Sequence, residues 1–202
     1  MKKSVAVPPV VEERGAPSVR ERILQTAATL FYQEGVRAAG VDLVVERSGV
    51  AKTSLYRHFA TKDDLVVAFL EREDAEYWGN WDSISAQHKD DAAAELEAHL
   101  RFIAHHIAEP RYRGCPFLNV ATEFPEPTHP ARAVALRNKA ELHRRLDVLA
   151  KKMGIRKHGL LADQLVLLID GAYMNSQLLG DKGSAHPLVV AGLALMLAAE
   201  QR

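Results

Sequence analysis

A seven-residue stretch from Lys52 to His58 gathers side chains that can bind a polyanion. It reads KTSLYRH and contains two cations, two hydroxyl groups, a tyrosine and a histidine. Such side chains hydrogen-bond to phosphate oxygens and to the edges of DNA bases. Leu55 and Phe59 are four residues apart, so they share one buried face of a helix. Gly49 precedes this helix and can adopt the positive φ that a tight turn requires.

The residues before Gly49 predict a second short helix, from Val41 to about Arg47. Leu43, Val44 and Val45 supply its apolar contacts. Two short helices joined by a tight turn form a helix-turn-helix, which places its second helix in the DNA major groove. The alternative is a polar surface helix without a ligand, and the density of cations and hydroxyl groups favours DNA reading.

Two further helices flank this unit. A Ser-x-x-Glu capping box at Ser18 predicts the start of the first helix, and Gly35 is placed to end it with a left-handed residue. A Thr-x-x-Asp cap at Thr61 opens the next helix, which starts at Lys62 and is expected to run past Trp78.

Residues 18–70 resemble the N-terminal domain of TetR-type transcriptional regulators. The resemblance rests on GVAKTSLYRHFATKDDLV and on the preceding FYQEGVRAAGVDLVVERS. The matching positions are Gly35, residues 45–50, Leu55-Tyr56, His58-Phe59, Lys62 and Leu65. One departure is Val41, where many members have a threonine that caps the second helix and contacts phosphate. That contact is therefore either missing here or made by a backbone amide.

The resemblance implies roles for individual residues of the third and fourth helices. The DNA base-reading residues would be Lys52, Thr53 and Arg57. The DNA phosphate contacts would be Ser54, Tyr56, His58 and Lys62.

Histidines and tryptophans in the middle of the chain admit more than one interpretation. A helix opened by Asp90-Asp91 carries His99 and His106 on one face. Two histidines on one face suggest a metal site, but no Asp or Cys lies at ligand spacing, so we expect no metal. The histidines are instead either exposed to solvent or part of a pocket. Trp78 and Trp81 are either core anchors or one wall of a pocket.

The segment from 113 to 124, RGCPFLNVATEF, is the most individual part of the second half. Pro116 suits a helix N-terminus. Asn119 and Glu123 share a helical face, where they either orient a small ligand or satisfy buried backbone groups. Cys115 is either a redox or electrophile sensor with a lowered pKa or a buried structural thiol. The candidate effector pocket comprises Phe102, His106, Phe117, Asn119, Glu123, Tyr173 and Asn175.

The last three helices are long. In the first of them, which begins near Pro130, we expect one face to contain Leu136, Ala140, His143, Leu146 and Leu149. The last two, at about 160–179 and 185–199, are apolar on more than one face, which calls for a partner. Small residues in them would allow close helix packing: Gly171, Ala172, Gly192 and Ala194. In TetR-type regulators the last two long helices form a four-helix dimer interface, so the resemblance implies a homodimer.

Composition limits the remaining possibilities. The formal net charge is zero, but residues 1–60 carry nine Lys/Arg against six Asp/Glu, as expected for a small DNA-binding head. A single cysteine excludes an intrachain disulfide and fits a cytoplasmic protein. The longest nearly apolar run, Leu188 to Ala199, is too short to span a bilayer. The sequence contains no nucleophile elbow, phosphate loop or cofactor fingerprint, so we expect neither an enzyme nor a bound cofactor.

The sequence therefore predicts an all-α protein of about nine helices. We expect a flexible arm at 1–17, a three-helix helix-turn-helix DNA-binding domain at 18–65, and a helical effector-binding and dimerisation domain at 66–202. The expected function is a regulator, most simply a repressor, that leaves a palindromic double-stranded DNA operator when a small-molecule effector binds. The alternative is a constitutive DNA-binding protein without an effector. The operator sequence, the effector, the regulated genes and the sign of regulation do not follow from the sequence.

Overall fold

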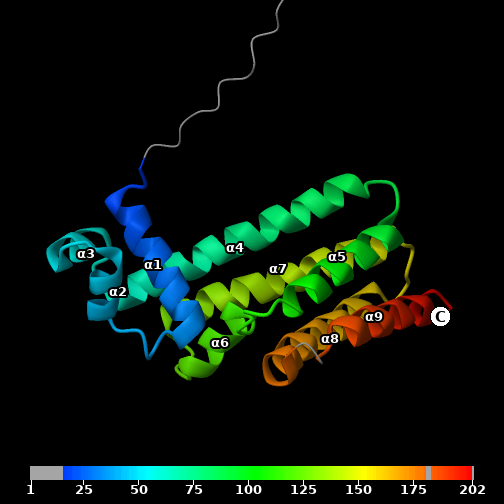
Figure 1. The fold of residues 1–202 in the computed structure, drawn as a ribbon. Helices are drawn as coiled ribbons and strands as arrows, with labels where there is room; N and C mark the ends of the chain where they lie inside the picture. The colour runs from blue at the N-terminus through cyan, green and yellow to red at the C-terminus, as the bar shows by residue number, and fades with distance from the viewer. Residues whose placement is uncertain (1–15, 181–182, 202) are drawn as a thin grey trace, which may run out of the picture.

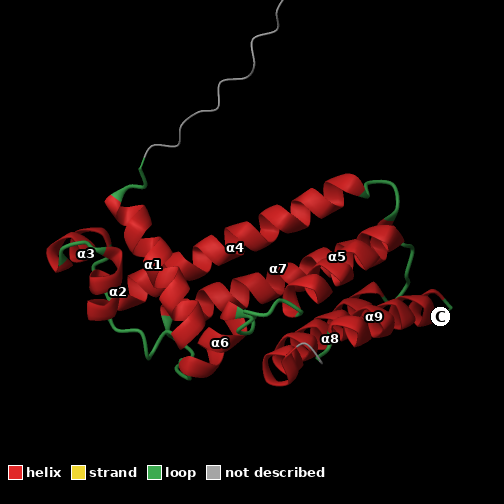
Figure 2. Ribbon diagram, in the orientation of Figure 1, coloured by secondary structure: helices red, strands yellow, loops and turns green. Residues whose placement is uncertain are grey.

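The computed structural model describes residues 16–180 and 183–201 of the 202-residue chain. Within these residues it contains nine α-helices and no strand (Figure 1, Figure 2), which confirms the predicted all-α class. The helices are α1 Val19–Glu34, α2 Val41–Ser48, α3 Lys52–His58, α4 Lys62–Gln87, α5 Ala92–Ile107, α6 Pro116–Glu123, α7 Pro130–Lys152, α8 His158–Leu179 and α9 Ala185–Glu200. Most of the predicted N-terminal arm lies outside the described residues.

Helices α1, α2 and α3 form a small unit at one end of the molecule (blue and cyan in Figure 1). The Ser18 hydroxyl caps α1 by accepting a hydrogen bond from the Glu21 amide at 3.1 Å. Gly49 has φ 65° and ψ 26°, the left-handed conformation predicted for the turn between α2 and α3. Gly35 also has a positive φ, of 93°, but its ψ of 150° lies outside the left-handed helical region, so that detail of the prediction is wrong.

Helix α4 connects this unit to the rest of the molecule. Thr61 and Asp64 form the capping box at its start, with both reciprocal hydrogen bonds present. Its 26 residues span about 39 Å at 1.5 Å per residue. Leu65 and Phe69 pack its first turns against α1, and its later turns pack against α5 and α7. One continuous helix therefore joins the two halves (Figure 1).

Helices α5 to α9 form the larger helical half. Helix α7 packs between α4 and α8, and α5 packs against α9. Gly192 makes the last contact close, because a Cβ atom there would lie 2.5 Å from Cδ1 of Leu100 in α5. Helix α6 is short and is tied to α7 by Arg132, whose guanidinium donates to the carbonyl oxygens of Ala121 and Phe124.

The buried face of α7 differs from the predicted one in its first half. Leu136 is 71% exposed and Ala140 is also exposed, whereas Leu146 and Leu149 are buried as expected. The face that packs inward instead contains Val134, Ala135, Asn138, Leu142, Leu146 and Leu149. The prediction failed because α7 contacts several helices along its length, so the apolar residues do not follow one straight stripe.

Helices α8 and α9 leave a row of large apolar side chains exposed on the single chain. Leu167 and Leu178 in α8 are 74% and 77% exposed, and Val190 and Leu197 in α9 are each 53% exposed. Gly171 lies on the exposed face of α8, where an added Cβ would meet no atom within 4 Å. Among the described residues, no helix is long and apolar enough to cross a membrane.

Candidate nucleic-acid interface and internal cavity

Helix α3 presents most of its polar side chains to solvent. Leu55 and Phe59 are buried and anchor the helix to the head. The exposed side chains are Lys52, Thr53, Tyr56, Arg57 and His58, and Ser54 is half-buried. A helix as short as α3 is not stable alone. The positions of its exposed side chains therefore depend on the packing of Leu55 and Phe59 against the head. The result is an exposed polar surface in which Lys52, Thr53, Tyr56 and Arg57 all carry hydrogen-bond donors.

The two lysines assigned to DNA contacts have different surroundings. Lys52 is exposed and its ammonium lies 2.6 Å from the Asp42 carboxylate of α2, which raises the lysine pKa. Lys62 is half-buried, with its ammonium 6.0 Å from the centre of the Phe31 ring, and burial lowers its pKa. Lys62 is therefore less available to a phosphate than the residues of α3. At the start of α2, no side chain among the described residues caps the helix where Val41 replaces a threonine.

A cavity of about 150 Å³ lies inside the larger half, between α4, α5, α6, α7 and α8. Four of the seven residues predicted for an effector pocket line it: Phe102, His106, Phe117 and Tyr173. The structure places the other three elsewhere. Asn119 and Glu123 line a separate open hollow beside α1, and Asn175 is exposed on α8.

Several lining residues were missing from the sequence-based set. Glu73, Tyr77 and Asn80 of α4 follow one another at spacings of four and three residues, and Glu76 lies beside them. From this spacing the sequence could have predicted that these residues share one face of a helix. Nothing in the sequence indicated which helix would pack against that face. Asn138, Lys139 and Leu142 of α7 complete the opposite wall.

The polar groups of the cavity are partly satisfied and partly free. The Lys139 ammonium lies 2.5 Å from the Asp170 carboxylate, and the Asn138 amide donates to Asp74 at 2.9 Å. The Tyr77 hydroxyl is buried beside Tyr173, yet it makes no hydrogen bond of good geometry within the described chain. Burial raises the pKa of both phenols, so they remain protonated donors.

Cys115 lines the cavity and is buried. Burial raises the pKa of its thiol, which is the opposite of the activation that a thiolate sensor requires. The structure therefore favours the interpretation as a buried structural thiol, although the residue lies immediately before the first turn of α6.

Asn119 and Glu123 join α6 to the head. Oε2 of Glu123 accepts a hydrogen bond from the Arg37 amide at 2.7 Å, and the Glu123 carbonyl accepts from the Arg37 guanidinium at 3.2 Å. The Asn119 amide donates to the Arg113 carbonyl at 3.0 Å. Arg113 in turn donates from its own amide to the Tyr32 hydroxyl of α1 at 3.0 Å. These side chains bind backbone groups, as one of the two sequence interpretations expected, but the groups that they bind are exposed and not buried.

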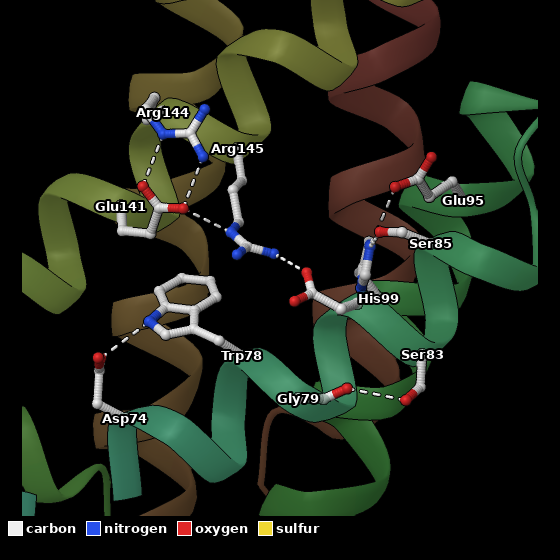
Figure 3. Close-up of polar contacts among 11 residues, drawn as sticks. Asp74, Trp78, Gly79, Ser83, Ser85, Glu95, His99, Glu141, Arg144 and Arg145 are labelled. Carbon is white, nitrogen blue, oxygen red and sulfur yellow. Dashed lines mark hydrogen bonds and ion pairs between the residues drawn. The ribbon is translucent and has the colours of Figure 1, made fainter. Parts of the chain in front are cut away.

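The two tryptophans of α4 do not line the cavity. The Trp78 indole donates to Asp74 at 2.9 Å and lies 4.5 Å from the Arg145 guanidinium, which also pairs with Glu141 at 2.7 Å (Figure 3). Trp81 is buried, and its ring stacks on His99 with 3.6 Å between ring centres. Both act as core anchors.

His99 and His106, predicted to share a face, have different environments. His99 is buried beside Glu95, with 3.6 Å between Nε2 and the carboxylate (Figure 3), and burial lowers its pKa to about 4. His106 lines the cavity and lies 3.5 Å from Glu109. In the described part of the chain, no group of three or more His, Cys, Asp or Glu side chains could hold a metal ion.

Comparisons with known proteins agree with this architecture. Residues 23–69 match the family model described as bacterial regulatory proteins, tetR family. A TetR-family transcriptional regulator from Streptomyces coelicolor is 28% identical and superposes with a TM-score of 0.86, covering 90% of this chain and 95% of its own. A regulator from Streptomyces avermitilis, titled as a putative TetR-type transcriptional regulator, is 30% identical with a TM-score of 0.79, covering 91% and 99%.

A sequence relative from Rhodococcus jostii is the transcriptional repressor KstR2, 34% identical over 91 residues, which are 45% of this chain and 44% of the relative. The matched stretch thus spans less than half the length of the first curated relatives. The solved structures, by contrast, match along almost the whole of both chains. Together with the helix-turn-helix and the helical half behind it, these similarities establish that the chain belongs to the TetR family of bacterial regulatory proteins.

Proposed function

We propose that this protein is a homodimeric, sequence-specific DNA-binding repressor that a small molecule releases from a palindromic operator. The observation that carries the proposal is the exposed polar surface of α3, held rigidly by the buried Leu55 and Phe59. In this proposal, residues 18–65 form the DNA-binding domain and residues 66–202 the effector and dimerisation domain. Helix α4 crosses the boundary between them.

The proposed roles in DNA reading follow the exposure of the side chains. Lys52, Thr53 and Arg57 read base edges, because an arginine or lysine can pair with guanine O6 and N7 and a threonine methyl can contact a thymine methyl. The phosphate contacts are Ser54, Tyr56, His58 and Lys62. Lys62 contributes least to DNA affinity in this proposal, because its ammonium is half-buried over Phe31.

The proposed dimer interface is the exposed apolar face of α8 and α9. Four of the five large exposed apolar side chains of α8 lie at positions 160, 167, 174 and 178, a spacing that keeps them on one stripe, and the fifth, Leu179, follows at the end of the helix. Val190, Ala194 and Leu197 continue an exposed stripe on α9. A two-fold axis through these helices would place the two α3 helices in successive major grooves, and so would require a palindromic site.

The proposed effector site is the internal cavity, and α6 provides the route to the head. Cys115, Pro116 and Phe117 line the cavity, while Glu123 at the other end of the same helix binds the Arg37 amide. A ligand that fits better when α6 is shifted would therefore favour a different head position. Release of DNA requires this differential affinity, because a ligand that bound both states equally would change nothing.

The second candidate is a constitutive DNA-binding protein without an effector. It would have the same α3 surface and the same dimer helices but a filled interior. The 150 Å³ cavity with its unpaired Tyr77 hydroxyl favours the effector-controlled regulator.

The proposal is tested by selecting binding sites from a random double-stranded DNA pool with the purified full-length protein. We expect enrichment of a palindrome, with an affinity that falls as the salt concentration rises. Leu167→Glu, which places a charge on the exposed face of α8, should convert the dimer into a monomer in sedimentation and abolish tight operator binding. Recovery of non-palindromic sites, or a dimer unaffected by Leu167→Glu, would contradict the corresponding part of the proposal.

A further inference from the structure

The charges around the cavity are unbalanced in favour of carboxylates. The cation in its wall, Lys139, is already paired with Asp170 at 2.5 Å and lies 5.5 Å from the Tyr173 ring. Glu73 and Glu76 also line the cavity, and neither forms an ion pair within the described residues. A ligand entering this space therefore meets one neutralised cation and two free carboxylates.

The charge of the Glu73 carboxylate is destabilised by burial and by the nearby carboxylate of Glu76, which is itself exposed. Glu73 is partly buried, and burial raises its pKa, with a further contribution from the negative charge of Glu76. Residues three apart on a helix are neighbours, so both carboxylates lie on the same part of α4. A cation placed between them would relieve both the lost solvation and the repulsion.

This imbalance is local to the cavity. Beside Trp78 of α4, the charged side chains of α7 are paired, because Arg145 binds Glu141 and lies against the Trp78 ring (Figure 3). Arg144 also binds Glu141, at 2.6 Å. The free carboxylates of Glu73 and Glu76 on α4 thus contrast with the paired charges of α7.

Aromatic side chains form much of the rest of the cavity wall. Phe102, Phe117, Tyr77 and Tyr173 contribute rings, and Leu142 contributes an aliphatic side chain. A cavity of about 150 Å³ is large enough for one benzene-sized ring. Aromatic faces also attract an organic cation.

We propose that the cavity binds a small aromatic amine, a single ring with a short arm that ends in a protonated amino group. The ammonium lies between Glu73 and Glu76, and the ring lies among Phe102, Phe117 and Tyr173. The Tyr77 hydroxyl, buried and without a hydrogen-bond partner in the described chain, is available to a polar substituent on the ring. As far as the amine acts as the effector, this inference rests on the proposed function.

Three probes of matched shape test the charge requirement: 2-phenylethylamine, 2-phenylethanol and phenylacetate. Isothermal titration and thermal unfolding are measured on the full-length protein, because a ligand that binds the native state raises its melting temperature. We expect the amine to bind at least about tenfold more tightly than the alcohol, and phenylacetate not to raise the melting temperature. A tenfold preference corresponds to about 1.4 kcal/mol.

Variants of α4 locate the site. Glu73→Gln and Glu76→Gln should each reduce amine affinity about tenfold and leave binding of the alcohol unchanged, since only the charged contact is lost. Glu71→Gln, on the same helix but exposed and outside the cavity, is the matched control and should have no effect. Equal binding of the amine and the alcohol, no binding of the amine, or an amine preference that survives both cavity substitutions would overturn the proposal.

A separate DNA measurement distinguishes this inference from the proposed function. Operator affinity is measured with and without saturating 2-phenylethylamine. Selective amine binding that depends on Glu73 and Glu76 but leaves operator affinity unchanged would support the ligand class and refute control by this cavity. Loss of operator binding caused by a ligand of another charge class would support an effector-controlled repressor and overturn the amine assignment.

Discussion

The DNA-binding head and the cavity of the larger half place their functional groups in opposite ways. In α3 the proposed reading residues lie on the outside of one seven-residue helix and point into solvent. In the cavity, the groups come from five helices and point inward. A surface contact depends on one helix being held in place, whereas an internal site depends on every helix around it. Substitutions should therefore act locally in the head and globally in the larger half.

Arg57→Ala tests whether a substitution in the head acts locally, and we expect it to have the largest effect on DNA binding. If Arg57 pairs with a guanine, its loss should cost about 1–3 kcal/mol of binding to the selected operator and relax base preference at one position. Fluorescence anisotropy on cognate and scrambled duplexes measures both quantities. Lys62→Ala serves as the comparison and should weaken the two duplexes alike. Equal losses on both duplexes for Arg57→Ala would show that this residue holds phosphate only.

The larger half should respond strongly to a single added methyl group. Gly192→Ala places a Cβ 2.5 Å from Leu100, which is fully buried, and overpacking of this kind costs about 1–3 kcal/mol of unfolding free energy. Gly79→Ala in α4, outside the proposed dimer face, is the matched control, because an added Cβ would meet no atom within 4 Å and alanine favours the helix by about 1 kcal/mol. Urea unfolding at one protein concentration compares the two. Similar stability of both variants would argue against the close packing of α5 on α9.

A buried histidine should make the larger half sensitive to acid. The pKa of His99 is about 4 in the folded protein and about 6.5 when unfolded, so between these values the unfolded chain binds more protons. The contribution of neutral His99 to the free energy of unfolding is present in full above pH 6.5 and is lost as the pH falls towards 4. At pH 5 the loss should be about 2 kcal/mol.

Urea unfolding at pH 7.5 and pH 5 measures this loss. His99→Phe, which keeps an aromatic ring against Trp81, should remove most of the pH dependence. His105→Asn, at an exposed position of the same helix, should leave it intact. If the pH dependence of stability persists in His99→Phe, another titratable group causes it.

The smallest expected effect concerns the contact between the two regions. Glu123→Ala removes the carboxylate that accepts from the Arg37 amide, a contact expected to be worth about 1 kcal/mol. Hydrogen exchange should become roughly fivefold faster at the Arg37 amide, in the loop before α2, and remain unchanged in α8. Faster exchange throughout the larger half would mean that Glu123 stabilises α6 itself and does not act as a specific link to the head.

The head was the more predictable region because its information is local. Ser18, Thr61 and Gly49 occupy caps and a turn that depend on neighbours within four residues, and all three adopt the expected role. The all-helical class followed from the same local signals. Helix α7 shows the limit of such signals: Leu136 fits an apolar stripe, yet it is exposed because the neighbouring helices lie against other faces.

The cavity could not be predicted from the sequence in the same way. Phe102, His106, Phe117 and Tyr173 were predicted to line an effector pocket, but Glu73 and Glu76 look like ordinary surface charges of a long helix until the structure shows that both line the cavity. Asn119 and Glu123 show the converse, since their polar side chains bind backbone groups of Arg113 and of Arg37, in the loop before α2, and do not line the cavity.

The sequence by itself determined the helices, their caps and the chemistry of α3, because these depend on residues a few positions apart. Only the tertiary structure decided which side chains face the cavity and which charges remain unpaired there, because both depend on helices far apart in the chain.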